Sequence, residues 1–176
     1  MEARPTEFAE FYRAARDDCF RTVLVSVGDW DTAQDLVAEA FARAWAFWRT
    51  VSRHPVPAAW VVRTALNLNV SRWRRHRREV PLPDPGVVAE RPAAGAAADG
   101  PIDSEIIAAV LRLPDRQRQV VALRLFLDLD TSRTAEVLGI APGTVTAHLA
   151  RAIATLREEL TSTLYERAPQ RGQNPS

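Results

Sequence analysis

The chain contains no lysine and a single cysteine, Cys19, among its 176 residues. One thiol excludes an intramolecular disulfide and a cysteine-based zinc cluster. Cys19 stands at helical spacing from Tyr12 and Ala15, so we expect a small buried side chain there and not a reactive thiol. All 23 basic residues are arginine, which suits bidentate phosphate contacts, although the codon bias of a GC-rich genome explains it more simply.

Long apolar runs are also missing. No stretch approaches the ~20 consecutive apolar residues that a membrane-spanning helix needs, and the N-terminal segment carries acidic residues. We therefore expect a cytoplasmic protein that has no membrane partner.

The sequence offers no pattern for catalysis or metal binding. The histidines, His54, His76 and His148, are too scattered for a metal site, and no nucleophile motif accompanies them. The prediction is therefore no catalytic residue, no metal and no cofactor, and the protein is not expected to be an enzyme.

Helical spacing of apolar residues recurs on both sides of a segment rich in proline, alanine and glycine, and strand-like alternation is absent. That segment, 79–101, interrupts helix and strand alike and is typical of a flexible linker. The sequence predicts an all-α fold of two small helical domains, 6–78 and 102–162, followed by a tail at 163–176.

Two amphipathic helices are predicted before residue 49, the first over about 6–27. Asp31 is predicted to cap the second helix, together with Gln34. The second helix presents Asp35 and Glu39 on its polar face, where two acids four residues apart repel each other mildly. A basic partner surface is one interpretation of that face, and solvated charge is the other.

A third helix is predicted from about Pro57, after a loop at 49–57, and it ends in the arginine run SRWRRHRR. Arginine runs are most often solvated helix ends. Here the run continues a polar stripe that includes Asn67, and asparagine can read base edges, so nucleic acid is the favoured partner. Trp60 and Trp73 could stack on exposed bases; core packing is the alternative, and more so for Trp73.

The C-terminal half predicts helices near 103–111 and 114–127, followed by a short helix and a last helix whose buried stripe extends to Leu160. Gly139 fits the left-handed cap of the first member of that pair, and Pro142 fits the start of the second. A helix, a glycine-centred turn and a second helix predict a helix-turn-helix that reads the DNA major groove.

Three motifs in this order resemble the extracytoplasmic-function (ECF) group of sigma-70 RNA polymerase sigma factors, most closely its SigE-like subgroup. DTAQDLVAEAFARAW is similar to region 2.2, AAWVVRTALNLNVSRWRRHRR to regions 2.3 and 2.4, and the segment from LPDRQ to LREEL to region 4. The resemblance implies a sigma-2-like domain of three or four helices and a sigma-4-like helix-turn-helix domain. It also implies a role in transcription initiation, in which the polymerase performs the chemistry.

The resemblance implies partners and positions for them. The partners are core RNA polymerase, through the β′ clamp helices and the β flap, promoter DNA, and an anti-sigma protein. Polymerase-binding positions are Asp35, Leu36, Glu39 and Phe41, with the acids expected as direct contacts and Phe41 as a core residue. Positions for the minus-ten element are Arg49, Arg53, Trp60, Arg63, Asn67, Arg72, Arg74 and Arg75, and the loop 49–57 is expected to hold a flipped base. Positions for the minus-thirty-five element are Arg116, Arg118, Thr144, Thr146, His148 and Arg151, with the first two expected on phosphates.

The sequence departs from the family pattern at three places. Arg133 and Thr134 stand where a Glu-Ile pair is common, which costs apolar burial, and Ala141 replaces a capping serine worth about 1 kcal/mol. Ser71 replaces a frequent aspartate.

Two other function classes are alternatives. A helix-turn-helix regulator that binds duplex DNA alone, as a dimer, explains the C-terminal half but leaves the N-terminal half without a role. A small nuclease would need a carboxylate or histidine cluster that the sequence lacks.

Overall fold

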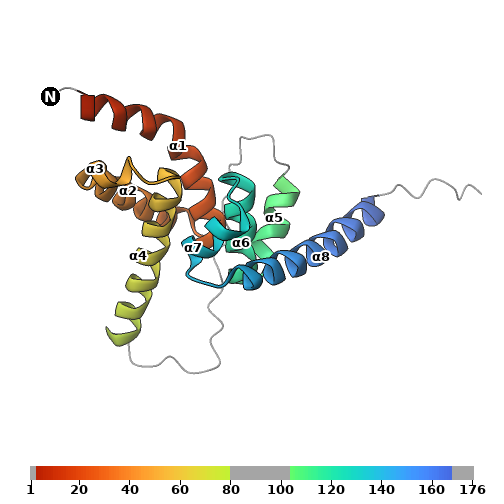
Figure 1. Ribbon diagram of the computed structural model, residues 1–176. Coiled ribbons are helices and arrows are strands. Elements are labelled where there is room, and N and C mark those ends of the chain that lie inside the picture. The colour runs from red at the N-terminus through yellow and green to blue at the C-terminus, as the bar shows by residue number, and fades with distance from the viewer. Residues whose placement is uncertain (1–2, 80–103, 168–176) are drawn as a thin grey trace, which may run out of the picture.

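The computed structural model describes residues 3–79 and 104–167. Within these ranges the chain forms eight helices and no strand (Figure 1). The helices are α1 (Ala3–Val27), α2 (Trp30–Ala46), α3 (Trp48–Val51), α4 (Pro57–Glu79), α5 (Ser104–Arg112), α6 (Asp115–Phe126), α7 (Thr131–Leu138) and α8 (Pro142–Arg167). The all-α prediction is confirmed for this part of the chain, and the predicted linker lies outside it apart from residue 79.

Helix α1 ends where the sequence supplies a glycine. Gly28 has φ 81°, and its N–H donates to the Leu24 carbonyl at 2.7 Å, which closes the last turn. Two buried hydroxyls near this end are satisfied locally, because Thr22 donates to the Asp18 carbonyl and Ser26 to the Thr22 carbonyl. The end of α1 can therefore be buried without losing hydrogen bonds.

Helix α2 has the predicted buried stripe, but its cap differs from the prediction. Asp29, not Asp31, is the N-cap, and its carboxylate accepts the Thr32 N–H at 2.8 Å. The helix therefore starts at Trp30, two residues earlier than a cap at Asp31 implies. The stripe consists of Ala33, Leu36, Val37, Ala40, Phe41 and Ala44.

The predicted loop at 49–57 is shorter than expected. Its first residues form the single turn α3, and the remaining segment turns through His54, whose Nδ1 accepts the Val56 N–H at 3.1 Å. Helix α4 starts at Pro57 as predicted, since proline at the first helical position has no N–H to leave unpaired.

The predicted helix-turn-helix is present, and its glycine and proline stand at the predicted helix boundaries. Gly139 caps α7 in the left-handed region (φ 65°), and α8 begins at Pro142. Asp130 caps the start of α7 by accepting the Arg133 N–H at 2.7 Å. A small core joins Val120 of α6, Ala135 of α7 and Val145 of α8.

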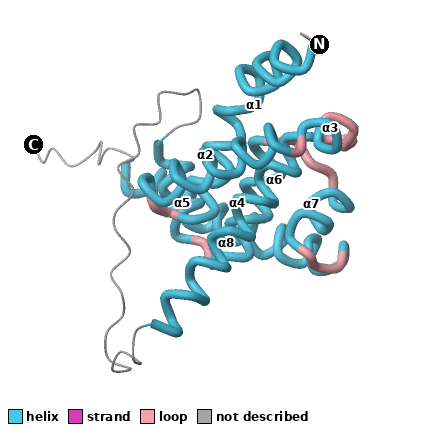
Figure 2. Tube along the Cα trace, turned by 90° about the vertical axis from the view of Figure 1, so that its left-hand side faces the viewer, coloured by secondary structure: helices cyan, strands magenta, loops and turns pink. Residues whose placement is uncertain are grey.

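The two halves pack against each other, with α1 lying against α6 and α4 against α7 (Figures 1 and 2). Val25 near the end of α1 belongs to a core that is otherwise C-terminal and includes Leu113 and Ala152. Conversely, Leu129 and Val137 belong to the main N-terminal core. Each half therefore completes the apolar core of the other.

Among the described residues no single helix is both long and apolar enough to cross a membrane. The pair α7 and α8 meets that criterion jointly, but it is bent by 102° at the turn between them.

The cap of α2 gives a stability prediction. Hydrogen bonds from the Thr32 side chain and backbone hold the pKa of the Asp29 carboxyl below its ordinary value of 3.8, so the carboxylate stabilises the fold above that pH. We expect Asp29→Ala to lower the free energy of unfolding by about 1 kcal/mol at pH 7. Most of that difference should disappear as the pH falls through the lowered pKa of Asp29. Urea unfolding at several pH values measures it, and an equal loss in Asp31→Ala would contradict the observed cap.

The single thiol gives a second prediction. Cys19 is fully buried in the main core, and burial raises the pKa of its thiol to about 12. We expect Ellman's reagent to modify Cys19 only as the protein unfolds, with full reaction in concentrated urea. Rapid modification of the native protein would show that α1 opens readily.

Candidate nucleic-acid and polymerase interface

The polar face of α2 presents the two acids that were predicted to bind polymerase. Asp35 is 73% exposed, and Glu39 is partly exposed beside it. Leu36 and Phe41 point the other way, into the main core, where Phe41 packs edge-on against Tyr12 with ring centroids 4.9 Å apart. Phe41 is thus a core residue, as expected. Leu36, predicted to bind polymerase, is instead fully buried because it belongs to the apolar stripe of α2, so only the acids lie on the accessible surface.

An arginine from α4 reaches this acidic face. Arg72 lies 3.2 Å from one Glu39 oxygen and 3.9 Å from an Asp35 oxygen. The second Glu39 oxygen accepts a 2.7 Å hydrogen bond from Arg43. Exposed ion pairs of this kind contribute about 0 to 1 kcal/mol, so a partner can replace either arginine at small cost. Arg72, which is predicted to face DNA, thus contacts the acidic face that is predicted to bind polymerase.

A cavity of about 280 Å³ opens between the end of α2 and the middle of α4. Its lining combines aromatic, hydroxyl, amide and guanidinium groups: Arg43, Phe47, Trp60, Thr64, Asn67, Leu68 and Ser71. The Thr64 and Ser71 hydroxyls donate to the carbonyls of Trp60 and Asn67, which leaves their oxygen lone pairs as acceptors. An aromatic wall with a few polar groups suits a flat polar ring such as a nucleobase.

The cavity differs in position from the base-binding loop predicted at 49–57. None of those residues, all of which the structure describes, lines it. Phe47 lines the cavity, and the sequence did not predict it as a site residue. Its side chain is 62% exposed, and it stands outside the apolar stripe of α2, which was the available signal.

Beyond the cavity, α4 projects from the body (Figure 1). Arg63, Arg74 and Arg75 are exposed, as are Arg49 and Arg53 near α3. The side chains of residues 76–79 are not described, so the last part of the arginine run is not placed.

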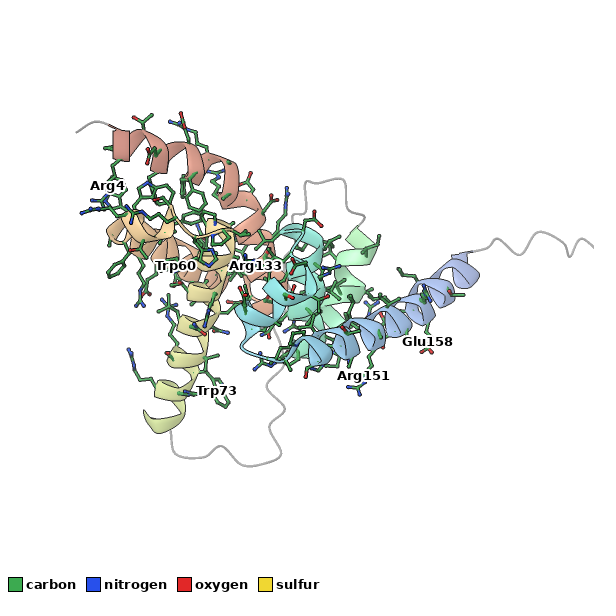
Figure 3. All side chains as sticks on the ribbon, in the orientation of Figure 1. Arg4, Trp60, Trp73, Arg133, Arg151 and Glu158 are labelled. Carbon is green, nitrogen blue, oxygen red and sulfur yellow. The ribbon has the colours of Figure 1, made fainter. Side chains whose placement is uncertain are left out.

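The two tryptophans of α4 are placed opposite to the prediction. Trp73, expected to be the more buried, is 56% exposed on the projecting part of the helix (Figure 3). Trp60 is partly buried against the main core and lines the cavity. The reason is that Trp73 lies on the part of α4 that extends beyond the other helices (Figure 3), outside the main core.

The first turns of α8 present the predicted recognition residues. Thr144, Thr146 and Arg151 are exposed, and His148 is half-buried with its Nδ1 enclosed. Arg116 at the start of α6 is exposed and donates to the Gln119 side chain at 3.2 Å.

Arg118 departs from the prediction. It was expected to touch phosphate, but it is 1% exposed, and its guanidinium donates to the Ser26 carbonyl at 3.1 Å and the Leu111 carbonyl at 3.2 Å. It also pairs with Asp115 at 2.8 Å. The cause is the packing of α1 on α6, which covers the side of α6 that carries Arg118, so it cannot reach DNA in this arrangement.

Metal binding finds no support among the described residues, where no group of three or more histidine, cysteine or acidic side chains is close enough to hold an ion.

Family comparisons divide the chain in the same way as the fold. The sigma-70 region 2 model matches residues 11–79, and the sigma-70 region 4 model matches residues 103–156. These ranges hold the acidic face and the cavity in the first case and the helix-turn-helix in the second.

Relatives of known identity cover most of the chain. It is 35% identical over 158 residues to an RNA polymerase sigma-E factor of Streptomyces coelicolor, covering 89% of this chain and 87% of the relative. It is 36% identical over 170 residues to the sigma-E factor of Streptomyces antibioticus, covering 94% and 91%. The ECF sigma factor SigW of Bacillus subtilis is 25% identical and covers 87% of this chain and 88% of the relative.

The fold is shared with a solved structure of the sigma factor RpoE from Bartonella quintana, which was crystallised with the anti-sigma factor NepR. The TM-score is 0.67 at 23% identity, and the match covers 88% of this chain and 97% of that one. With both sigma-70 regions matched in order and sigma-E factors as relatives, the chain belongs to the sigma-70 family of RNA polymerase sigma factors, in its extracytoplasmic-function group.

Proposed function

We propose that this sigma factor docks on core RNA polymerase through the acidic face of α2, captures an unpaired promoter base in the cavity between α2 and α4, and anchors upstream through α8. The observation that carries the proposal is the position of the cavity, which lies beside the acidic face and the exposed arginines of α4. The protein contributes recognition and strand separation, not catalysis, and acts in the cytoplasm where the polymerase works.

The docking step uses Asp35 and Glu39. Both lie on one exposed face of α2, where they form weak surface pairs with Arg43 and Arg72. A basic surface on the β′ clamp helices can replace these pairs and satisfy both acids together.

The strand-capture step uses the cavity. Extruding a base from the duplex costs a few kcal/mol, which a binding site must return. Stacking on an aromatic side chain returns about 1 to 3 kcal/mol per base, and Phe47 and Trp60 supply the rings. The Asn67 amide offers a donor and an acceptor to the edge of the base, and the arginines of α4 lie along the backbone of the same strand.

The C-terminal half, proposed to be the domain 102–162, reads the minus-thirty-five element. Thr144, Thr146 and Arg151 are exposed on the first turns of α8, where a recognition helix meets base edges or backbone.

The β flap of the polymerase is the proposed protein contact of this half. An anti-sigma protein that covers the α2 surface is the proposed regulator, as its presence beside the Bartonella relative suggests.

A stand-alone regulator is the second candidate that the sequence raised. It provides no use for the acidic face or for the cavity, and no observation favours it. It would give a symmetric footprint on duplex DNA without polymerase.

The docking surface can be tested by charge reversal. We expect Asp35→Arg with Glu39→Arg to weaken binding to core polymerase at least about 100-fold, because like charges across an interface cost several kcal/mol. Titration of labelled protein with core polymerase by fluorescence anisotropy measures the effect. The matched control is Glu7→Arg with Glu10→Arg, which makes the same charge change on exposed positions of α1. Equal binding by both double variants would contradict the assignment.

The cavity can be tested by deleting one amide. We expect Asn67→Ala to reduce promoter opening about tenfold, because a lost base-edge contact is worth about 1 to 3 kcal/mol. The measurement is the fluorescence of 2-aminopurine placed in the minus-ten element, with polymerase present. Asn69→Ala is the control, since Asn69 lies on the same helix but not in the cavity lining. A normal signal from Asn67→Ala would show that the base is held elsewhere.

A further inference from the structure

The corner between α2 and α3 carries Phe47, the more exposed of the two rings that line the cavity. Phe47 is the C-cap of α2, and α3 starts at the next residue, Trp48. The Phe47 side chain is 62% exposed and belongs to none of the apolar cores that the described residues form. The position of this ring therefore depends on how the backbone of the corner is held.

Arg4 of α1 binds this corner directly before Phe47. The last carbonyls of a helix have no partner within it and carry the negative end of the helix dipole. From the first turn of α1 (Figure 3), the Arg4 guanidinium donates to the Trp45 carbonyl at 2.8 Å and lies 3.5 Å from the Ala46 carbonyl oxygen. A cation from α1 thus caps the end of α2.

Aromatic rings attach the same corner to α1. The Arg4 guanidinium carbon lies 5.1 Å from the centre of the Trp45 ring, within the range of a cation–π contact. Phe8, one turn later in α1, packs edge-on against Trp45 and Trp48, with ring centroids 5.1 and 5.2 Å apart. The two tryptophans before and after Phe47 therefore pack against α1, whereas Phe47 lines the cavity.

We infer that Arg4 is a positioning residue for base capture: it fixes the backbone of the α2–α3 corner, and through that corner the Phe47 ring, without touching the base. Arg4 is not in the cavity lining, so its action must pass through the corner. A binding group must be held within about 0.5 Å of its productive geometry, which an exposed ring on a loose corner cannot maintain. The inference rests on the proposed function, in which Phe47 stacks on an unpaired base.

The contacts of Arg4 separate base capture from polymerase docking. The acidic face of α2 pairs with Arg43 and Arg72, and the contacts of Arg4 are at the other end of the same helix, on Trp45 and Ala46. Loss of the Arg4 guanidinium should therefore impair promoter opening and leave the affinity for core polymerase unchanged.

Promoter opening by the full-length protein tests the inference, with 2-aminopurine in the minus-ten element and saturating core polymerase. Arg4→Met keeps the length of the side chain but removes its charge and donors, and we expect opening to fall at least about threefold. Arg4→Lys, which restores a cation above the Trp45 ring, should recover most of the loss. Arg13→Met, at an exposed position of the same helix, is the matched control and should open the promoter normally. Normal opening by folded Arg4→Met, or a weakened affinity for core polymerase that accounts for its defect, would overturn the inference.

A double-variant cycle tests whether Arg4 acts through Phe47. We expect Phe47→Ala alone to reduce opening at least about fivefold, because it removes a stacking ring. In that background Arg4→Met should cause no further loss, since a positioning residue has nothing left to position. Losses that add in the double variant would show that Arg4 acts elsewhere. Arg4→Gln, a milder change, replaces any variant that circular dichroism shows to be unfolded.

A measurement on the free protein makes this inference separable from the proposed function. Fluorophenylalanine is incorporated at all six phenylalanines, and the fluorine resonance of Phe47 is identified by its loss in Phe47→Leu. We expect Arg4→Met to shift that resonance and Arg13→Met to leave it in place; an unshifted resonance in Arg4→Met would refute the inference.

The two failures give different results. Normal opening by Phe47→Ala, with a shifted resonance in Arg4→Met, would refute base capture in the cavity and leave the control of Phe47 by Arg4 standing. Defective opening by Phe47→Ala, with normal opening and an unshifted resonance in Arg4→Met, would refute the positioning role and leave the proposed function standing.

Discussion

The end of α1 determines how this molecule is assembled. Its final turn must bury Val25 and satisfy the Ser26 carbonyl, and both requirements are met by α6 of the other half. Arg118 must in turn be shielded from water together with its hydrogen-bond acceptors, which α1 accomplishes. Because these needs are complementary, two units that the sequence separates by a linker share their apolar cores.

Buried apolar residues and exposed charged residues have different roles in this fold. The apolar residues of α2 and α4 fix the orientation of both helices, since each fully buried valine or leucine side chain contributes about 1.5 to 3 kcal/mol. The charged pairs on the outside, such as Arg72 with Glu39, contribute little and exchange easily. Stability therefore comes from the interior, and the exposed acids and arginines remain available to partners.

Periodicity was sufficient to predict much of the fold. The amphipathic stripe of α2, the left-handed Gly139 and the start of α8 at Pro142 depend on residues near in sequence, and the sequence predicts all three. The cap of α2 was misassigned because Asp29 and Asp31 are both good capping residues, and backbone geometry around Gly28 selects the first.

The errors in the candidate site have a common cause in distant packing. Arg118 has the local pattern of a phosphate-binding residue. It is buried because α1 packs on α6 and places Ser26, which is 92 residues away in sequence, against its guanidinium. The cavity likewise needs Phe47 and Asn67 on neighbouring helices, which no local spacing reveals. Trp73 is exposed because α4 extends past its neighbours, which also depends on the whole assembly.

The measurement that tests the account most directly is run-off transcription with core RNA polymerase from a GC-rich bacterium, this protein and a pool of genomic fragments, with start sites sequenced. We expect defined starts that share two upstream motifs about 25 base pairs apart. Absence of protein-dependent transcripts, combined with a specific footprint of the protein alone on duplex DNA, would contradict it.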